Sequence, residues 1–358
     1  MAGKRLPSET RIARDVEHVL AARLPKGWRL RAKRDASIGD ARIDLRVEIA
    51  SPAGEIATLA VEITRVLEPR MAPEAAERIT MLSRRVDVGA VPVVAVAYLS
   101  PRARAILDDF EVGYLDTTAN VRIEVRSPGL FVLTQGADRD PWPQSSDLQS
   151  LRGRGAGRAV RALIDTAPPF GIRELASATG ASAPTISRVL ELLEREAIVT
   201  REPRGPVLAV DWQAAIRRWA EDYDQISSNS ATMYLEPRGL AALEEKFIGS
   251  KLAYAATGAF AAQRFDPIAP ARVAALYVGD VARAAQRLGL RETDAGANVM
   301  LLEPFDPVVF DRTVDRDGLR CVAPSQLAVD LLTGPGREPS QGEEMLAWMK
   351  DNEQVWRV

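Results

Sequence analysis

The chain has 358 residues, of which 46% are hydrophobic and 27% charged, and its formal net charge is −2 at pH 7. This composition is typical of globular proteins, and the length allows roughly two or three domains. No apolar run is long enough to span a membrane, and the polar N-terminal segment lacks a secretory pattern. One cysteine, Cys321, and one histidine, His18, exclude a disulfide framework and a Cys/His zinc finger. We therefore expect a cytoplasmic protein with no membrane partner.

Residues 10–135 alternate between helical and strand patterns, which predicts an α/β unit. The expected helices are 11–24, 73–85 and 101–109, and the expected strands are 28–32, 41–49, 58–64, 91–98, 121–125 and 130–133. Asp116 and Asn120 favour a turn before the last two strands, because their side chains bond to nearby backbone. A polar segment rich in proline and serine follows at 136–147 and predicts a linker, with a boundary near residue 145.

The order of these elements resembles the core of the PD-(D/E)xK nuclease superfamily, so we expect a restriction-endonuclease-like α/β domain at 1–140. The residues that carry the resemblance are Asp44 on the second strand and Glu62-Ile63-Thr64 at the end of the third. In active members of the superfamily, such acidic residues hold a divalent metal that orients the attacking water. Here Thr64 stands at the position of the expected lysine, and Arg65 points to the opposite face of the strand.

We therefore assign no catalytic or metal-binding residue to this domain, and we expect it to lack a cofactor and to be inactive. A structural, DNA-contacting or sensing role remains open for it. The alternative is a metal-dependent DNA nuclease with Mg²⁺ as cofactor. In that case Asp44 and Glu62 bind the metal, and Glu17 on the first helix joins them as a third catalytic carboxylate.

Residues 172–210 carry the most informative pattern of the chain. A helix at 172–179 is followed by a turn at Gly180 and by a second helix capped by Ser182, with Pro184 in its first turn. Apolar residues of the second helix fall at the i, i+3, i+4, i+7 positions of one buried stripe. Two β-prone runs, 198–201 and 207–210, flank the turn sequence at 203–206. Helix, turn, helix and hairpin in this order resemble a winged helix-turn-helix, which we place within 141–228.

The resemblance implies that double-stranded DNA is the main partner, although some winged helices mediate protein contacts instead. Small, hydroxylic and cationic side chains on the free face of the second helix suit a major groove, and the preceding helix at 152–164 has a basic start. The candidate base contacts are Thr185, Ser187 and Arg188, with Ser182 and Pro184 at the start of the same helix. The candidate phosphate contacts are Arg154, Arg158, Arg201 and Arg204.

A helix is expected at 213–225 and a break at 226–230, after which residues 229–358 form a third, α/β domain. The expected strands there are 252–256, 272–278 and 299–302, and the expected helices are 238–247, 259–265, 281–288, 326–333 and 341–350. The turn at 254–258 resembles the strand-to-helix turn that opens nucleotidyltransferase-like folds. Those enzymes need acidic residues on the next strand, and 273–278 carries none. We therefore expect a degenerate nucleotidyltransferase-like domain.

Residues 298–310, 323–332 and 334–337 resemble the C-terminal part of AbiEi-like antitoxins and related bacterial winged helix-turn-helix regulators. In that family the winged helix usually opens the chain, whereas here an α/β domain precedes it. The resemblance implies a sequence-specific DNA-binding transcriptional regulator, cytoplasmic and associated with the nucleoid. A homodimer is expected because symmetry doubles the length of the DNA site. The alternatives are the targeted nuclease and an antitoxin that neutralises a toxin-like protein partner.

Overall fold

The computed structural model describes residues 5–38, 41–142, 150–203, 205–247, 252–266, 270–293 and 295–358. The fold is mixed α/β and divides into two compact units. The first unit runs to residue 147, and the second holds nearly all of the chain from residue 148 onward. Within the described ranges, no helix has the length and apolar character needed to cross a membrane.

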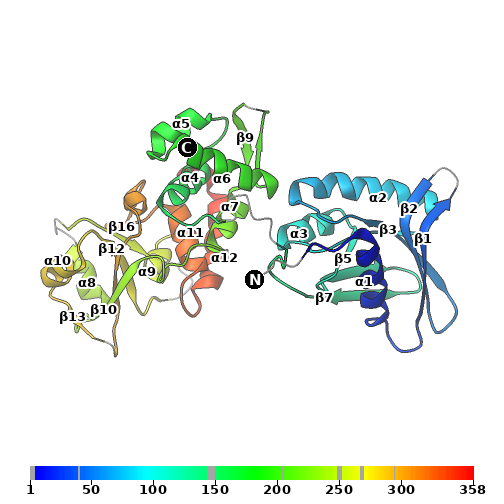
Figure 1. Cartoon of the computed structure of the whole chain (residues 1–358). Helices are drawn as coiled ribbons and strands as arrows, with labels where there is room; N and C mark the ends of the chain where they lie inside the picture. The colour runs from blue at the N-terminus through cyan, green and yellow to red at the C-terminus, as the bar shows by residue number, and fades with distance from the viewer. Residues whose placement is uncertain are drawn as a thin grey trace. The chain divides into compact units, whose positions relative to one another are not determined.

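The first unit is one seven-stranded sheet in the order β1-β2-β3-β4-β5-β6-β7, covered by helices on both faces (Figure 1). The central pairs β3–β4 and β4–β5 are parallel, and the other pairs are antiparallel. Its strands are β1 (Arg29–Ile38), β2 (Ala41–Ala50), β3 (Ile56–Ile63), β4 (Val91–Val96), β5 (Gly113–Asp116), β6 (Val121–Val125) and β7 (Leu130–Thr134). Its helices are α1 (Glu9–Ala21), the 3-10 turn η1 (Pro69–Met71), α2 (Ala72–Val86) and α3 (Pro101–Asp109).

Two separate hydrophobic clusters show how the helices cover this sheet. Helix α1 buries Ile12, Val16 and Leu20 in one cluster together with Val61, which lies on β3. Helices α2 and α3 bury apolar side chains in the other cluster, together with Ala60, the neighbour of Val61. Because successive strand residues point to opposite faces, α1 and α2 cover opposite faces of the sheet.

The predicted elements of this unit are all present, and most bounds agree within two residues. Strand β1 is longer than expected, since it continues to Ile38 along its whole pairing with β2. The turn predicted from Asp116 and Asn120 is confirmed: Asp116 is fully buried, and its Oδ1 accepts hydrogen bonds from the backbone N–H groups of Thr118 and Asn120.

The second unit combines a two-stranded hairpin with a seven-stranded sheet in the order β13-β10-β14-β12-β11-β16-β15. The helices are α4 (Arg154–Asp165), α5 (Ile172–Thr179), α6 (Ala183–Arg195), α7 (Trp212–Ala220), α8 (Leu240–Phe247), α9 (Gly258–Ala262), α10 (Val281–Leu288), the 3-10 turn η2 (Pro307–Phe310), α11 (Pro324–Leu332), α12 (Glu338–Asp351) and α13 (Glu353–Trp356). The strands are β8 (Val199–Arg201), β9 (Val207–Val210), β10 (Ser230–Leu235), β11 (Tyr254–Thr257), β12 (Ala274–Val278), β13 (Arg291–Glu292), β14 (Val299–Glu303), β15 (Val314–Arg316) and β16 (Leu319–Cys321).

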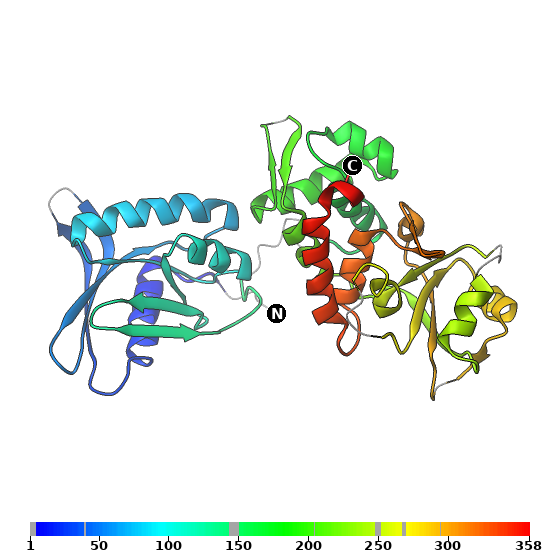
Figure 2. The same ribbon diagram turned by 180° about the vertical axis from the view of Figure 1, so that it is seen from behind.

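One hydrophobic core runs through this whole unit. It includes Leu163 of α4, Leu190 of α6, Trp219 of α7 and Leu327 of α11, and it extends to Trp356 near the C-terminus. Helices α11 and α12 lie side by side, and α11 packs against α7 and α4 (Figure 2). The boundary expected between residues 228 and 229 is therefore not a boundary between separate cores.

One prediction about the middle of this unit is wrong, and one strand there was not predicted. The helix expected at 213–225 ends at Ala220, because Asp224 turns the chain by accepting hydrogen bonds from the N–H groups of Ile226 and Ser227. The break expected at 226–230 is present at 226–229, but the strand that follows it, β10, was not expected; it pairs with β14 and β13. Strand β10 has no clear strand pattern in the sequence because five of its six residues are exposed or only partly buried. Strands β13, β15 and β16 were also not expected, since each has only two or three residues.

Candidate nucleic-acid interface

Helices α5 and α6 meet at a tight turn. Gly180 ends α5 in the left-handed conformation, with φ at 64°, which a residue without a side chain adopts at little cost. Ser182 then starts α6: its Oγ accepts a hydrogen bond from the N–H of Thr185 at 3.3 Å, as expected of a helix cap. The β8–β9 hairpin follows α6, and a backbone bridge between Phe170 and Val207 ties the hairpin to the start of α5 (Figure 1).

Helix α4 packs closely against the start of α6. A Cβ atom placed at Gly155 would lie only 3.1 Å from Cγ2 of Thr185, so the approach of the two helices requires a small residue there. Thr185 is consequently half-buried, while its neighbours Ser182 and Pro184 are exposed. The first turn of α6 is thus held in place by α4 and still presents two of the predicted contact residues to solvent.

The remaining predicted residues of α6 lie along its outer face. Arg188 is exposed, and its Nε donates to the carbonyl oxygen of Pro184 at 3.2 Å, one turn back. Ser187 is half-buried, and its Oγ donates to Glu191 at 3.2 Å. The opposite face carries Ile186, Val189 and Leu193, all fully buried as the spacing predicts. The helix therefore has one buried face and one face with a single exposed cation in its middle.

The predicted phosphate contacts are placed very differently from one another. Arg158 donates to both oxygens of Asp306, which is fully buried, and this hydrogen-bonded carboxylate raises the pKa of the guanidinium. Arg201 lies 2.8 Å from Glu194 and is mostly buried. Each of these two charges is neutralised within the chain. Arg154 is exposed, and among the described residues it donates only to the backbone carbonyl of Phe305, at 2.9 Å, so no described carboxylate neutralises its charge. Arg204 lies outside the described residues.

One cation at this surface was not predicted. Arg173 is exposed in the first turn of α5. Among the residues that the structure describes, neither Arg173 nor Arg188 forms an ion pair with a carboxylate. The position of Arg173 directly after the expected start of the first helix was the signal that could have identified it.

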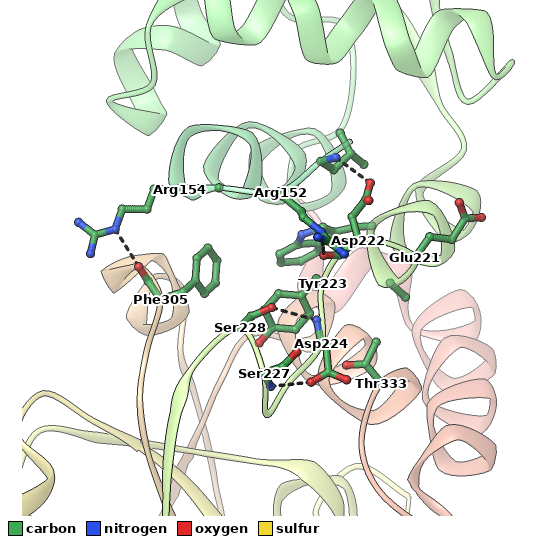
Figure 3. Close-up of a pocket in the computed structure, with 14 residues that line it drawn as sticks. Arg152, Arg154, Glu221, Asp222, Tyr223, Asp224, Ser227, Ser228, Phe305 and Thr333 are labelled. Carbon is green, nitrogen blue, oxygen red and sulfur yellow. Dashed lines mark hydrogen bonds between the residues drawn. The ribbon is translucent and has the colours of Figure 1, made fainter. Parts of the chain in front are cut away.

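A cavity of about 650 Å³ lies beside α4 in the same unit (Figure 3). It is bounded by the start of α4, the turn after α7 and the segment at Phe305. Arg152 donates from Nε to the carbonyl oxygen of Asp222 at 3.2 Å, and Arg154 lies on the side of Phe305. The volume is in the range of small-molecule sites. Arg152 precedes α4 and Arg154 begins it, so one wall of the cavity is formed by the start of the helix that contacts α6.

The three carboxylates of the possible nuclease site do not converge. Glu17 lies on α1 and binds Arg34 of β1, whereas Glu62 forms a bidentate ion pair with Arg78 of α2. Since α1 and α2 cover opposite faces of the sheet, the expectation that Glu17 joins the other two is wrong. Asp44 accepts a hydrogen bond from the backbone N–H of Ile63 at 2.8 Å. Nowhere in the described ranges do three or more His, Cys, Asp or Glu side chains form a group able to hold a metal.

The turn that resembles a nucleotidyltransferase motif is closed by a carboxylate of this chain. The backbone N–H of Ala259, at the start of α9, donates to Glu338 of α12 at 3.1 Å. Burial raises the pKa of the Glu338 carboxyl. Gly258 has φ at 61°, and a Cβ there would lie 3.1 Å from the same carboxylate oxygen. A side chain of the protein therefore occupies the position next to this turn.

Asp330 of α11 lies at the centre of a buried polar network that the sequence did not reveal. Its carboxylate accepts hydrogen bonds from Thr257 at 2.5 Å, Tyr223 at 2.8 Å and Gln326 at 2.8 Å, and from Tyr277. Burial raises the pKa of the Asp330 carboxyl to about 6. The network joins the turn after α7 to β11, β12 and α11, and so ties residues 150–223 to the rest of their unit.

Comparison with protein-family models, with curated proteins and with solved structures finds no match to this chain. The assignment of function therefore rests on the residues and on their geometry.

Proposed function

We propose that the protein is a sequence-specific, double-stranded DNA-binding regulator of transcription that reads its site with α6. The observation that carries the proposal is the exposed face of α6, which presents Ser182, Pro184 and Arg188 from a helix whose opposite face is buried. A helix that follows α5 after a tight turn, contacts α4 at its first turn and precedes a hairpin can enter a major groove. Arginine is the commonest reader of guanine there, since its fork of donors matches two acceptors on the base edge.

The phosphate contacts in this proposal are fewer than the sequence suggested. Arg154 and Arg173 are exposed without an acidic partner among the described residues, so both suit contacts to the DNA backbone. Arg158 forms an ion pair with Asp306, and Arg201 forms one with Glu194. We assign these two arginines to holding the domain together.

The finer features of the hypothesis belong to the same proposal. They are a cytoplasmic, nucleoid-associated homodimer, a relationship to AbiEi-like regulators, and flanking domains that resemble a nuclease and a nucleotidyltransferase. A dimer would place two copies of α6 on half-sites about one helical turn of DNA apart. Sites recovered from genomic DNA should then contain two related half-sites with that spacing.

The test is to select bound fragments from genomic DNA and to measure the affinity of Arg188→Ala for the preferred fragment. We expect a loss of about 1–3 kcal/mol in binding free energy, the usual value of a good base contact. The matched control is Arg283→Ala, which removes an exposed helical arginine from α10 and should leave the affinity unchanged. Equal affinities of Arg188→Ala and the unmodified protein would contradict the proposed placement of α6.

A further inference from the structure

Strand β1, at the edge of the first sheet, carries a row of cations on one face. Arg29, Arg31 and Lys33 alternate along the strand with Leu30 and Ala32. Leu30 and Ala32 pack against the cluster on the α1 side of the sheet, so the three cations point to the other side. All three are exposed. We name Arg29, Arg31 and Lys33 the β1 stripe.

The charges of the β1 stripe are not neutralised by neighbours. In the register of the sheet, Arg31 lies opposite Glu48 and Lys33 opposite Arg46. Glu48 is 3.1 Å from Arg46 and forms its ion pair on the same strand. None of the described carboxylates forms an ion pair with a member of the stripe. By contrast Arg34, the next cation along β1, is paired with Glu17 on the opposite face.

The spacing of the stripe suits a polyanion whose charges recur at regular intervals. Side chains on one face of a strand recur about every 6.7 Å, and the strand is a nearly straight support. The phosphates of a nucleic acid strand form a comparable row, and each bound phosphate releases condensed counterions. Charged residues on an edge strand also prevent pairing between sheets, but that role requires neither a single sign of charge nor the absence of ion pairs.

We propose that the β1 stripe binds the phosphate backbone of duplex DNA without reading its sequence, as a second DNA contact of the chain. The inference rests on the proposed function, in which duplex DNA is the partner of α6. Two contacts on one chain reinforce each other, because binding by the first raises the effective concentration of the second. The first unit then contributes affinity, and α6 contributes specificity.

The experiment measures how the affinity of the full chain for a random-sequence duplex depends on salt. The variant is Arg29→Ala/Arg31→Ala/Lys33→Ala. The slope of log K against log salt should become shallower by roughly 2–3, since each lost phosphate contact removes about 0.9 from it. The matched control is Arg11→Ala/Arg14→Ala/Arg126→Ala, which removes the same charge from exposed positions elsewhere in the first unit. The control should keep the original slope.

Further arms distinguish the possible failures. Arg29→Lys/Arg31→Lys keeps the charges and should keep the slope. If the triple variant does not fold, as judged by its thermal unfolding, Arg31→Ala alone should make the slope shallower by about 0.9. Equal slopes for the stripe variant and the control triple would overturn the proposal. So would a loss of binding to phosphatidylserine vesicles without any change on DNA, which would identify a membrane surface as the partner.

The proposal for the β1 stripe and the proposal for α6 can be contradicted independently of each other. If α6 does not read DNA, Arg188→Ala leaves binding to the preferred fragment unchanged, and the stripe variant still alters the slope on random DNA. If the stripe does not touch DNA, the slope stays constant and Arg188→Ala still weakens binding to the preferred fragment.

Discussion

Asp330 is fully buried, and four side chains donate hydrogen bonds to its carboxylate. Removal from water penalises the charged form and raises the pKa from its ordinary value of 3.8 to about 6, although the hydrogen bonds act in the opposite direction. The folded protein therefore holds this proton more tightly than the unfolded chain does. The resulting contribution to stability is fully present below pH 3.8 and is lost as the pH rises through about 6.

Asp330→Asn should remove this pH dependence, because the amide does not titrate in this range. The free energy of unfolding of the variant, relative to the unmodified protein, should rise by on the order of 1 kcal/mol between pH 5 and pH 7. Denaturant unfolding at several pH values measures this difference. Asp351→Asn is the control, since Asp351 is exposed, and its relative stability should stay constant. A constant difference for Asp330→Asn as well would show that the native pKa is not raised.

At the scale of elements, α4 is tied by its arginines to the segment before η2. Arg158 projects from α4 to Asp306, which also accepts a hydrogen bond from the N–H of Val308 and so starts the 3-10 turn. On the same helix, Arg161 is buried and binds Asp165 and Gln326. The arginines of α4 form a pattern that is typical of a DNA contact. Arg158 and Arg161, however, bind side chains of the protein itself.

A double-mutant cycle with Arg158→Ala and Asp306→Asn tests this assignment. The coupling energy for unfolding should be about 1–3 kcal/mol, because the carboxylate is fully buried and would lose its ionic partner. The control cycle uses Arg217 and Glu343, which form an ion pair with both side chains about half exposed. That cycle should give a coupling of at most about 0.5 kcal/mol. Similar couplings in both cycles would mean that Arg158 is free for an external partner.

At the scale of the whole molecule, the two units have separate cores, but the second unit does not divide further. Trp212 and Trp219 of α7 belong to the same cluster as Leu327 of α11 and Trp356 of α13. The rings of Trp212 and Trp356 lie 5.1 Å apart in an edge-to-face contact. Helix α7 therefore buries much of its apolar surface against α11 and α13.

We expect a chain of residues 150–358 to fold cooperatively and a chain of residues 150–228 not to do so. The shorter chain would expose the apolar face of α7 that α11 and α13 cover in the complete unit. Thermal unfolding followed by circular dichroism compares the two. A sharp transition in the shorter chain, at a similar temperature, would show that residues 150–228 form an independent domain.

The sequence alone determined the elements whose signals are local. The stripe of Ile186, Val189 and Leu193 predicted a helix where α6 lies, and Ser182 and Gly180 predicted the turn before it. The hydrophobic period of a helix and its capping residues depend on positions only a few residues apart, so they can be recognised in the sequence alone. The face of α6 proposed to meet DNA was identified in the same way.

Only the tertiary structure decided which charges remain available. Arg158 and Arg201 look like Arg154 in the sequence, yet the first two form ion pairs with carboxylates, and Arg154 forms none with the residues that the structure describes. The position of Glu17, away from Glu62, likewise follows from the face of the sheet that its helix covers. Strand β10 and the network around Asp330 depend on partners more than fifty residues away. Such pairings follow from sheet order and packing, because burial and ion pairing are properties of the assembled fold rather than of neighbouring residues.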